Sequence, residues 1–145
     1  MKKETRAENL LLAAWVTALV ATLGSLYFSE VLGFVPCDLC WFQRIFMYPQ
    51  VIILGIAIVR KEFSTARYSL ALSVIGGLIS LYHYALQKIP VFQHYAIQCG
   101  RIPCTGQYMN WLGFITIPFL ALTAFLIIAL LSVAVMRQQK RRNNV

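Results

Sequence analysis

Two cysteines, Cys37 and Cys40, stand three positions apart where a short connection meets a long apolar run. The Cys-x-x-Cys spacing holds two sulfurs close enough to form a small reactive ring, and a helix start acidifies thiols through its exposed N–H groups and positive dipole end. Arg44 follows Cys40 by four residues, so a helix that includes Cys40 places a cation near its sulfur. The pattern predicts a redox pair, while the spacing alone also fits half a metal site, a structural bridge or two reduced core thiols.

A second pair, Cys99 and Cys104, lies in a long loop over residues 88–110. Gly100 and Pro103 between these cysteines favour a turn that could close a small disulfide loop. The sequence has four cysteines in all, so none stands outside the two pairs. Two such pairs suggest a relay that passes a disulfide by thiolate exchange.

His83 is an ionisable residue near the end of an otherwise apolar run. Such residues within membrane segments are usually turned inward or functional. Tyr82 and Tyr84 flank it, so a histidine in an interfacial aromatic belt is an equally good interpretation. The sequence leaves both interpretations open.

The elements that must position these residues are four apolar runs. The 145 residues are 59% hydrophobic and 12% charged, with a mean hydropathy of +0.68, which is too apolar for an ordinary soluble domain. A membrane-crossing helix takes about 20 residues, and the short alternating strands of a β-barrel do not occur in the sequence. We predict an all-α integral membrane protein, a single membrane domain built as a four-transmembrane-helix bundle, with spans at residues 10–28, 41–59, 68–87 and 112–136.

Several local signals refine this prediction. The first run follows a basic leader, as in a secretory signal, but it is long and lacks a small-x-small cleavage site, so we expect a retained helix. Pro49 predicts a kink in the second span, where Gln50 could satisfy a freed backbone group. Small residues recur in the third span and favour close helix packing. The cysteines lie in two loops, residues 29–40 and 88–110. In the second loop, the apolar Val91 and Phe92 after Pro90 predict a short interfacial helix.

The basic residues indicate the orientation in the membrane. Ten of the 13 Lys and Arg residues lie in the leader, in the turn between the second and third spans, and in the tail. The positive-inside rule then places both termini in the cytoplasm and all four cysteines on the extracytoplasmic side, where disulfides persist. The net charge of +8 belongs to these topology signals, so we expect no nucleic-acid partner.

A disulfide relay needs a final acceptor for two electrons. The sequence has no dinucleotide-binding fingerprint, haem-attachment motif or iron–sulfur cysteine set. A lipid-soluble quinone in the bilayer is the simplest remaining acceptor. We therefore expect a quinone as cofactor and no resident metal.

Together these features resemble the disulfide bond formation protein B (DsbB) family of membrane thiol oxidoreductases, and most of all its short BdbC-type members from Gram-positive bacteria. The resemblance covers nearly the whole chain, through four spans, the first cysteine pair with Arg44 after it, residues 83–87, the second cysteine pair and residues 111–113. The two cysteines of the second pair lie much closer together than in the long members. The resemblance implies a multi-pass enzyme of the bacterial plasma membrane that supports disulfide bond formation in exported proteins.

The family's mechanism can be carried onto the matching cysteines. By this resemblance, a thioredoxin-like thiol oxidase of the DsbA or BdbD type attacks the Cys99–Cys104 disulfide at Cys99. Cys104 then attacks Cys37, and Cys40 leaves as a thiolate.

The resemblance also implies where the electrons go. A membrane quinone, either menaquinone or ubiquinone, accepts them beside Cys40. Arg44 matches an arginine that assists this contact, and His83 matches a quinone-side histidine.

Three other classes share some of these features. A vitamin K epoxide reductase-like enzyme also joins membrane helices, cysteine pairs and quinone, but its Cys-x-x-Cys lies later in the chain. A membrane protein could bind a metal through four thiolates, with His83 or His94, although oxidised cysteines could not serve as ligands. A structural protein with two disulfide staples is the third class.

Overall fold

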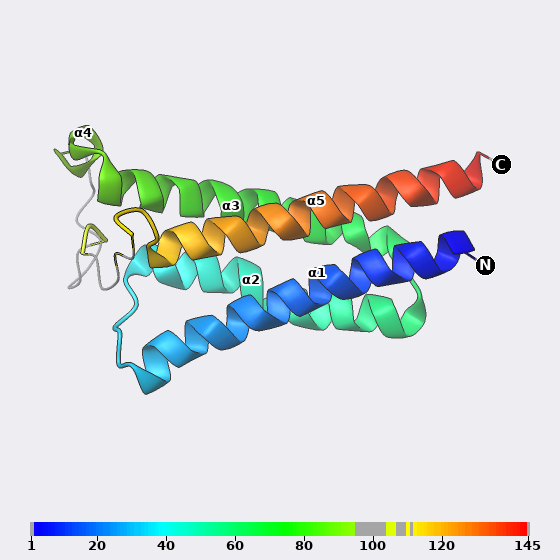
Figure 1. Cartoon of the computed structure of the whole chain (residues 1–145), viewed down its shortest axis with the longest axis horizontal. Coiled ribbons are helices and arrows are strands. Elements are labelled where there is room, and N and C mark those ends of the chain that lie inside the picture. The colour runs from blue at the N-terminus through cyan, green and yellow to red at the C-terminus, as the bar shows by residue number, and fades with distance from the viewer. Residues whose placement is uncertain (1, 95–103, 107–109, 111, 145) are drawn as a thin grey trace.

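The computed structural model describes residues 2–94, 104–106, 110 and 112–144. Four long helices run through it (Figure 1). Each is long and apolar enough to cross a membrane, which confirms the predicted all-α membrane fold. The four are α1 (Lys2–Leu26), α2 (Asp38–Arg60), α3 (Ala66–Lys88) and α5 (Ile117–Asn143).

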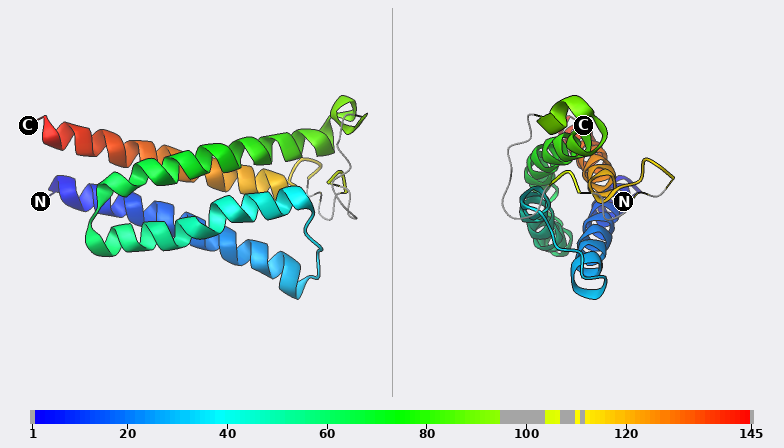
Figure 2. Two further views of the ribbon diagram at one scale, coloured as in Figure 1. Left: turned by 180° about the vertical axis from the view of Figure 1, so that it is seen from behind. Right: turned by 90° about the vertical axis from the view of Figure 1, so that its left-hand side faces the viewer.

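The four long helices form a ring in which α1 and α3 each pack against both α2 and α5. Both termini and the turn between α2 and α3 lie at one end of the bundle (Figures 1 and 2). The start of α2, the end of α3 and the start of α5 lie at the opposite end, which we call the cysteine end. This arrangement brings three segments that are distant in sequence to one place.

Helix α1 begins earlier than the predicted span because its polar leader has partners. Ala7 and Leu11 are buried, and Glu8 forms an ion pair with Lys61 at 3.0 Å, next to the end of α2. At the cysteine end, α1 continues as the π-helical turn η1 (Tyr27–Val31). Gly33 then takes a φ of 68°, a conformation that glycine adopts at little cost, and leads the chain toward α2.

Gln50 lies beside Pro49, but the carbonyl that it pairs with is not the one that the proline frees, so its predicted backbone role is not confirmed. It is completely buried, and its side chain donates a hydrogen bond to the Phe46 carbonyl at 3.1 Å, next to the carbonyl that the proline leaves unpaired. Its side-chain oxygen accepts hydrogen bonds from Ser69 at 2.8 Å and Ser73 at 3.1 Å, both on α3. Gln50 therefore joins α2 to α3 through fully paired polar groups, as an apolar interior requires.

The small residues of α3 allow α5 to approach closely. A methyl group added at Gly76 would overlap the ring of Phe125 on α5. A methyl group at the neighbouring Gly77 would meet the Phe125 Cβ atom at an ordinary contact distance of 3.6 Å. The predicted close packing on this face is thus confirmed, and Gly76 is the position that requires a glycine.

Helix α5 begins at Ile117, later than the predicted start of the fourth span at residue 112. Leu112 and Gly113 have φ angles of 53° and 81°, which an α-helix cannot contain. Thr116 is the extended N-cap, and Pro118 lies in the first turn, where its missing N–H would have no helical partner. Two short helices complete the described fold: η2 (Phe63–Thr65) and α4 (Pro90–His94), the latter being the predicted short helix after α3.

Candidate active site

Cys37 and Cys40 lie at the start of α2, as the sequence predicts. Cys37 is the N-cap residue with extended backbone, and Cys40 is in the first helical turn. The Cys37 thiol donates a hydrogen bond to the Cys40 sulfur, and the two sulfurs are 3.3 Å apart. Cys37 is buried, whereas Cys40 is partly exposed. The structure therefore holds this pair as neighbouring reduced thiols, with Cys40 as the accepting sulfur.

The two thiols are expected to react at very different rates with an alkylating reagent. The hydrogen bond to Cys40, together with burial, raises the pKa of the Cys37 thiol from its ordinary value of 9.0 to about 12. At neutral pH this leaves Cys37 with about a thousandfold less thiolate than an ordinary cysteine, and the thiolate is the reactive form. Iodoacetamide should therefore modify Cys40 of the reduced protein and leave Cys37 intact, as located by fragmentation mass spectrometry.

The unfolded protein is the control for this experiment, because there both cysteines should react alike. Labelling of folded Cys37 should rise only as the pH approaches about 12. Modification of Cys37 ahead of Cys40 in the folded protein at pH 7 would contradict the donor role of Cys37.

His83 joins the start of α2 to the segment that carries Cys104. Its side chain is only 1% exposed, so the inward interpretation is confirmed over the aromatic belt. The Gln43 side-chain amide donates to the His83 Nδ1 atom at 3.0 Å, which leaves the proton on Nε2. That Nε2–H donates to the Cys104 carbonyl at 3.1 Å, and the same nitrogen lies 3.7 Å from the Cys37 sulfur. The imidazole thus holds the backbone of Cys104 beside Cys37.

Arg44 lies one turn after Cys40 and ties α2 to α1. Its Nε donates to the Ser25 hydroxyl at 3.0 Å, and its Nη2 donates to the Ser25 carbonyl at 3.1 Å. The guanidinium also lies over the Trp41 ring at 5.3 Å, and the Tyr48 hydroxyl donates to the same Ser25 hydroxyl at 3.4 Å. Arg44 therefore uses two of its five N–H donors for hydrogen bonds to Ser25 on α1.

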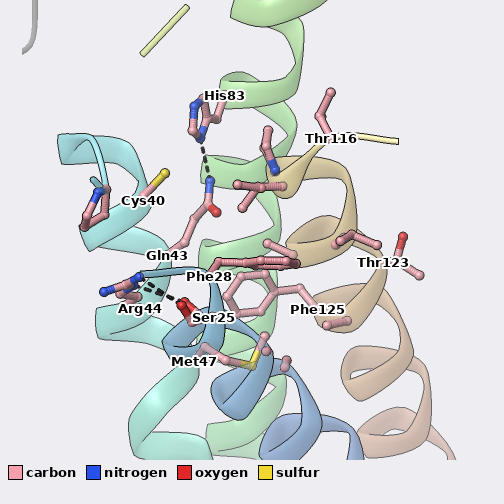
Figure 3. A pocket seen from close by; sticks show the side chains of 18 of the residues that line it. Ser25, Phe28, Cys40, Gln43, Arg44, Met47, His83, Thr116, Thr123 and Phe125 are labelled. Atoms are coloured by element: carbon pink, nitrogen blue, oxygen red, sulfur yellow. Dashed lines mark hydrogen bonds between the residues drawn. The ribbon is translucent and has the colours of Figure 1, made fainter. Parts of the chain in front are cut away.

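A cavity of about 540 Å³ lies between the helices at the cysteine end. Apolar side chains from α1, α2 and α5 form most of its wall. Thr116 contributes a hydroxyl that is almost fully buried and that has no hydrogen-bond partner among the described residues. Figure 3 shows Arg44 and Thr116 on opposite sides of the cavity. The other polar groups in the wall include Cys40, Gln43 and His83.

The structure brings most of the predicted site residues together. Cys37, Cys40 and His83 are in mutual proximity, and Cys104 contacts His83 through its carbonyl. Arg44 shares the cavity wall with Cys40, although its hydrogen bonds go to Ser25. Cys99 and its predicted closure onto Cys104 lie outside the described residues.

Three residues of this site were not singled out by the sequence. Gln43 orients His83, Ser25 holds Arg44, and Thr116 in the cavity wall has a buried hydroxyl without a partner among the described residues. Ser25 is a polar residue near the end of an apolar run, and Gln43 is one within a predicted span. Polar residues in such runs are candidates for interior contacts. Their individual partners come from other helices and loops, so spacing along the chain could not identify them.

Paired thiols beside an apolar cavity in a four-helix membrane bundle define a membrane thiol redox protein. The family model described as "Disulfide bond formation protein DsbB" matches residues 6–135. "Probable disulfide formation protein C 1" of Bacillus cereus is 55% identical over 139 residues, which cover 96% of this chain and 100% of the relative. "Disulfide bond formation protein C" of Bacillus subtilis is 55% identical over 118 residues, which cover 81% of this chain and 86% of the relative.

A more distant relative, a "Probable disulfide formation protein" of Metapseudomonas resinovorans, is 43% identical over 131 residues, which cover 90% of this chain and 91% of the relative. No solved structure matches the chain. The chain belongs to the DsbB family of disulfide bond formation proteins. It is therefore a multi-pass membrane disulfide oxidoreductase, and the resemblance that the sequence suggested is confirmed.

Proposed function

We propose that this protein is a thiol:quinone oxidoreductase. It reoxidises a thioredoxin-like thiol oxidase of the DsbA or BdbD type, and it passes the electrons through two cysteine pairs to a membrane quinone, menaquinone or ubiquinone. The observation that carries this proposal is the apolar cavity of about 540 Å³ with Cys40 and Arg44 in its wall. A relay sulfur thus borders a space of the size and polarity that suits a lipid-soluble ring.

The residues around the cavity fit a quinone. The predominantly apolar wall suits its ring and hydrocarbon chain. Arg44 has N–H donors beyond the two that Ser25 accepts. On the opposite side, the buried Thr116 hydroxyl has no partner among the residues that the structure describes. The Thr116 oxygen has almost no accessible surface, so we assign only Arg44 as a donor to a quinone oxygen.

A bound quinone supplies an acceptor for two electrons and two protons. Cys40 lies in the cavity wall and carries the electron pair as a thiolate after exchange at Cys37. Arg44, one helical turn away, stabilises negative charge in this low-dielectric space. Return of the pair to the Cys37–Cys40 disulfide removes two electrons and two protons from the protein.

The preceding exchanges balance in the same way. The partner's two thiols become a disulfide, while Cys99 and Cys104 become thiols. Cys104 then attacks Cys37, so that the Cys37–Cys104 bond forms, the Cys37–Cys40 bond breaks and Cys40 leaves. Cys99 next attacks Cys104, so that the Cys99–Cys104 bond forms again, the Cys37–Cys104 bond breaks and Cys37 is released as a thiol. His83 holds the Cys104 carbonyl 3.1 Å from Nε2 and beside Cys37, so we assign it a positioning role in this exchange. Its contact with the quinone stays a prediction from the resemblance.

The charge distribution supports the orientation of this relay. The start of α1, the turn after α2 and the end of α5 carry most of the Lys and Arg residues, and they lie together at the end opposite the cysteines (Figure 1). By the positive-inside rule we place this end in the cytoplasm and the cysteine end outside, where the partner and its clients are oxidised.

Arg44→Met is expected to slow quinone reduction while the bundle stays folded. The substitution removes a cation and its hydrogen-bond donors from the cavity wall, and a hydrogen bond to a charged group contributes about 1.5–3 kcal/mol. The value of kcat/KM for quinone should therefore fall about 10- to 100-fold. Stopped-flow absorbance of added quinone, with a reduced thioredoxin-like partner as electron donor, measures this ratio.

Ser25→Ala is the matched control, because it removes the hydroxyl that accepts from Arg44 but keeps the Ser25 carbonyl and the arginine charge. Its kcat/KM should change by only a few-fold. If Arg44→Met leaves the quinone kinetics unchanged, neither the cation nor its link to α1 assists quinone reduction. If Ser25→Ala is as damaging as Arg44→Met, the link between α1 and α2 matters more than the cation. Either result would show that the quinone assignment of Arg44 is wrong.

A further inference from the structure

Three potential metal ligands converge at the cysteine end. The sulfurs of Cys37 and Cys40 and a ring nitrogen of His83 all lie within 4.8 Å of one another. The two sulfurs are 3.3 Å apart, and the Cys37 sulfur lies 3.7 Å from the His83 Nε2 atom. In tetrahedral zinc sites, Zn–S bonds of about 2.3 Å and Zn–N bonds of about 2.0 Å separate neighbouring ligand atoms by about 3.5–3.8 Å. The reduced pair therefore lies close to coordination geometry without rearrangement of the helices.

The surroundings of His83 also suit a metal ligand. A ligating histidine is usually oriented by a hydrogen bond at its other ring nitrogen. Gln43 already occupies the Nδ1 side at 3.0 Å, and its side-chain amide offers an acceptor as well as a donor. It could thus accept the proton of Nδ1–H when Nε2 binds a cation. Cys40 is partly exposed, which gives an ion a route to the buried ligands.

We propose that the reduced protein binds one thiophilic divalent cation of the Zn²⁺ class through Cys37, Cys40 and His83, and that this site inhibits disulfide transfer. Coordination replaces the thiol protons of both cysteines, and Nε2 turns from the Cys104 carbonyl to the ion. Both sulfurs are then withheld from exchange, and the contact that holds Cys104 beside Cys37 is broken. Three protein ligands leave a fourth coordination position for water. The ion takes no part in electron transfer.

The redox state of the pair controls this site. When the Cys37–Cys40 disulfide forms, both sulfur ligands are lost and the cation is released. The cation should therefore inhibit protein whose Cys37–Cys40 pair is reduced, and it should not inhibit protein in which this pair is kept oxidised. The inference needs only the described geometry of the three side chains, so it stands or falls separately from the identity of the electron acceptor.

The test is a titration of the full-length, tag-free protein in detergent with Co²⁺ and then Zn²⁺. Co²⁺ is the probe because thiolate-to-metal charge-transfer bands and intense visible bands report tetrahedral thiolate coordination, whereas Zn²⁺ has a filled d shell and absorbs no visible light. We expect one Co²⁺ per reduced chain, displacement by Zn²⁺, and no such bands with the oxidised protein. His83→Ala should weaken binding by about tenfold or more, since even outer partners of a ligand change affinity by about 10- to 100-fold. His94→Ala, which changes an exposed histidine on α4, should bind as the unaltered protein does.

A second measurement uses the unaltered protein and so does not depend on the folding of any variant. Zn²⁺ should protect Cys40 of the reduced protein from iodoacetamide, and EDTA should restore both alkylation and oxidation of the partner. Equal binding by oxidised and reduced protein, a reduced complex without charge-transfer bands, unchanged affinity in His83→Ala, or alkylation of Cys40 that is insensitive to Zn²⁺ would each overturn the proposal.

Discussion

Cys40→Ser is expected to abolish quinone-coupled turnover, lowering the steady-state rate by at least about a thousandfold, the scale on which loss of an essential reacting group acts. Serine cannot form the disulfide with Cys37, and the substitution removes the Cys40 sulfur from the cavity wall. The first exchange at the second cysteine pair does not need Cys40, so a reduced partner should still be oxidised once. Stopped-flow measurement of partner thiols together with quinone absorbance should therefore show a single turnover with no quinone consumed.

Asp38→Asn is a control for substitution between the two cysteines, because Asp38 is exposed and lies in the same helical turn. It should keep the full rate and stoichiometric quinone loss. Continued quinone reduction in Cys40→Ser would show that electrons leave by another route. A complete absence of partner oxidation in both the variant and the unaltered protein, after an oxidised starting state has been verified, would instead show that the partner class has been misassigned.

The fold could be predicted from sequence largely because a membrane imposes a length and a polarity on each helix. The four spans follow from such local constraints. Helix ends do not, because they depend on partners from elsewhere in the chain. Helix α1 extends into its polar leader where Glu8 meets Lys61, and α5 starts late because Leu112 and Gly113 take positive φ angles.

The site was predictable where its chemistry is encoded in adjacent residues. The Cys-x-x-Cys spacing identifies Cys37 and Cys40 in the sequence, and their position at the start of α2 accounts for their geometry. His83 was ambiguous because its burial depends on Gln43 of α2 and on the Cys104 segment, which lies 21 positions away in sequence. The contact between Arg44 and Ser25 was not foreseen, since 19 positions and a helix connection separate the two residues. Such contacts arise from packing, which periodicity along one helix does not describe.

Packing also connects α3 to the cavity through Gly76 and Phe125, and this contact supports a second large expected effect. Phe125 lines the cavity, while Gly76 lies behind it on α3 and leaves room for its ring. Gly76→Ala would place a methyl group where that ring now lies, and overpacking of this kind costs about 1–3 kcal/mol. If the ring moves, the cavity is the space open to it. We therefore expect both a lower unfolding temperature in detergent and a clearly higher KM for quinone.

The adjacent glycine provides a control that differs in packing alone. Gly77→Ala adds the same methyl group at an ordinary contact distance of 3.6 Å from Phe125, so stability and KM should both be preserved. Combining Gly76→Ala with Phe125→Leu should recover stability relative to Gly76→Ala alone, because residues in direct contact are energetically coupled. Equal effects of the two alanine substitutions would show that loss of helix flexibility matters, and not the overlap with Phe125. A Gly76→Ala protein that is destabilised but keeps its KM would mean that the ring moves away from the cavity, and that the quinone does not contact this wall.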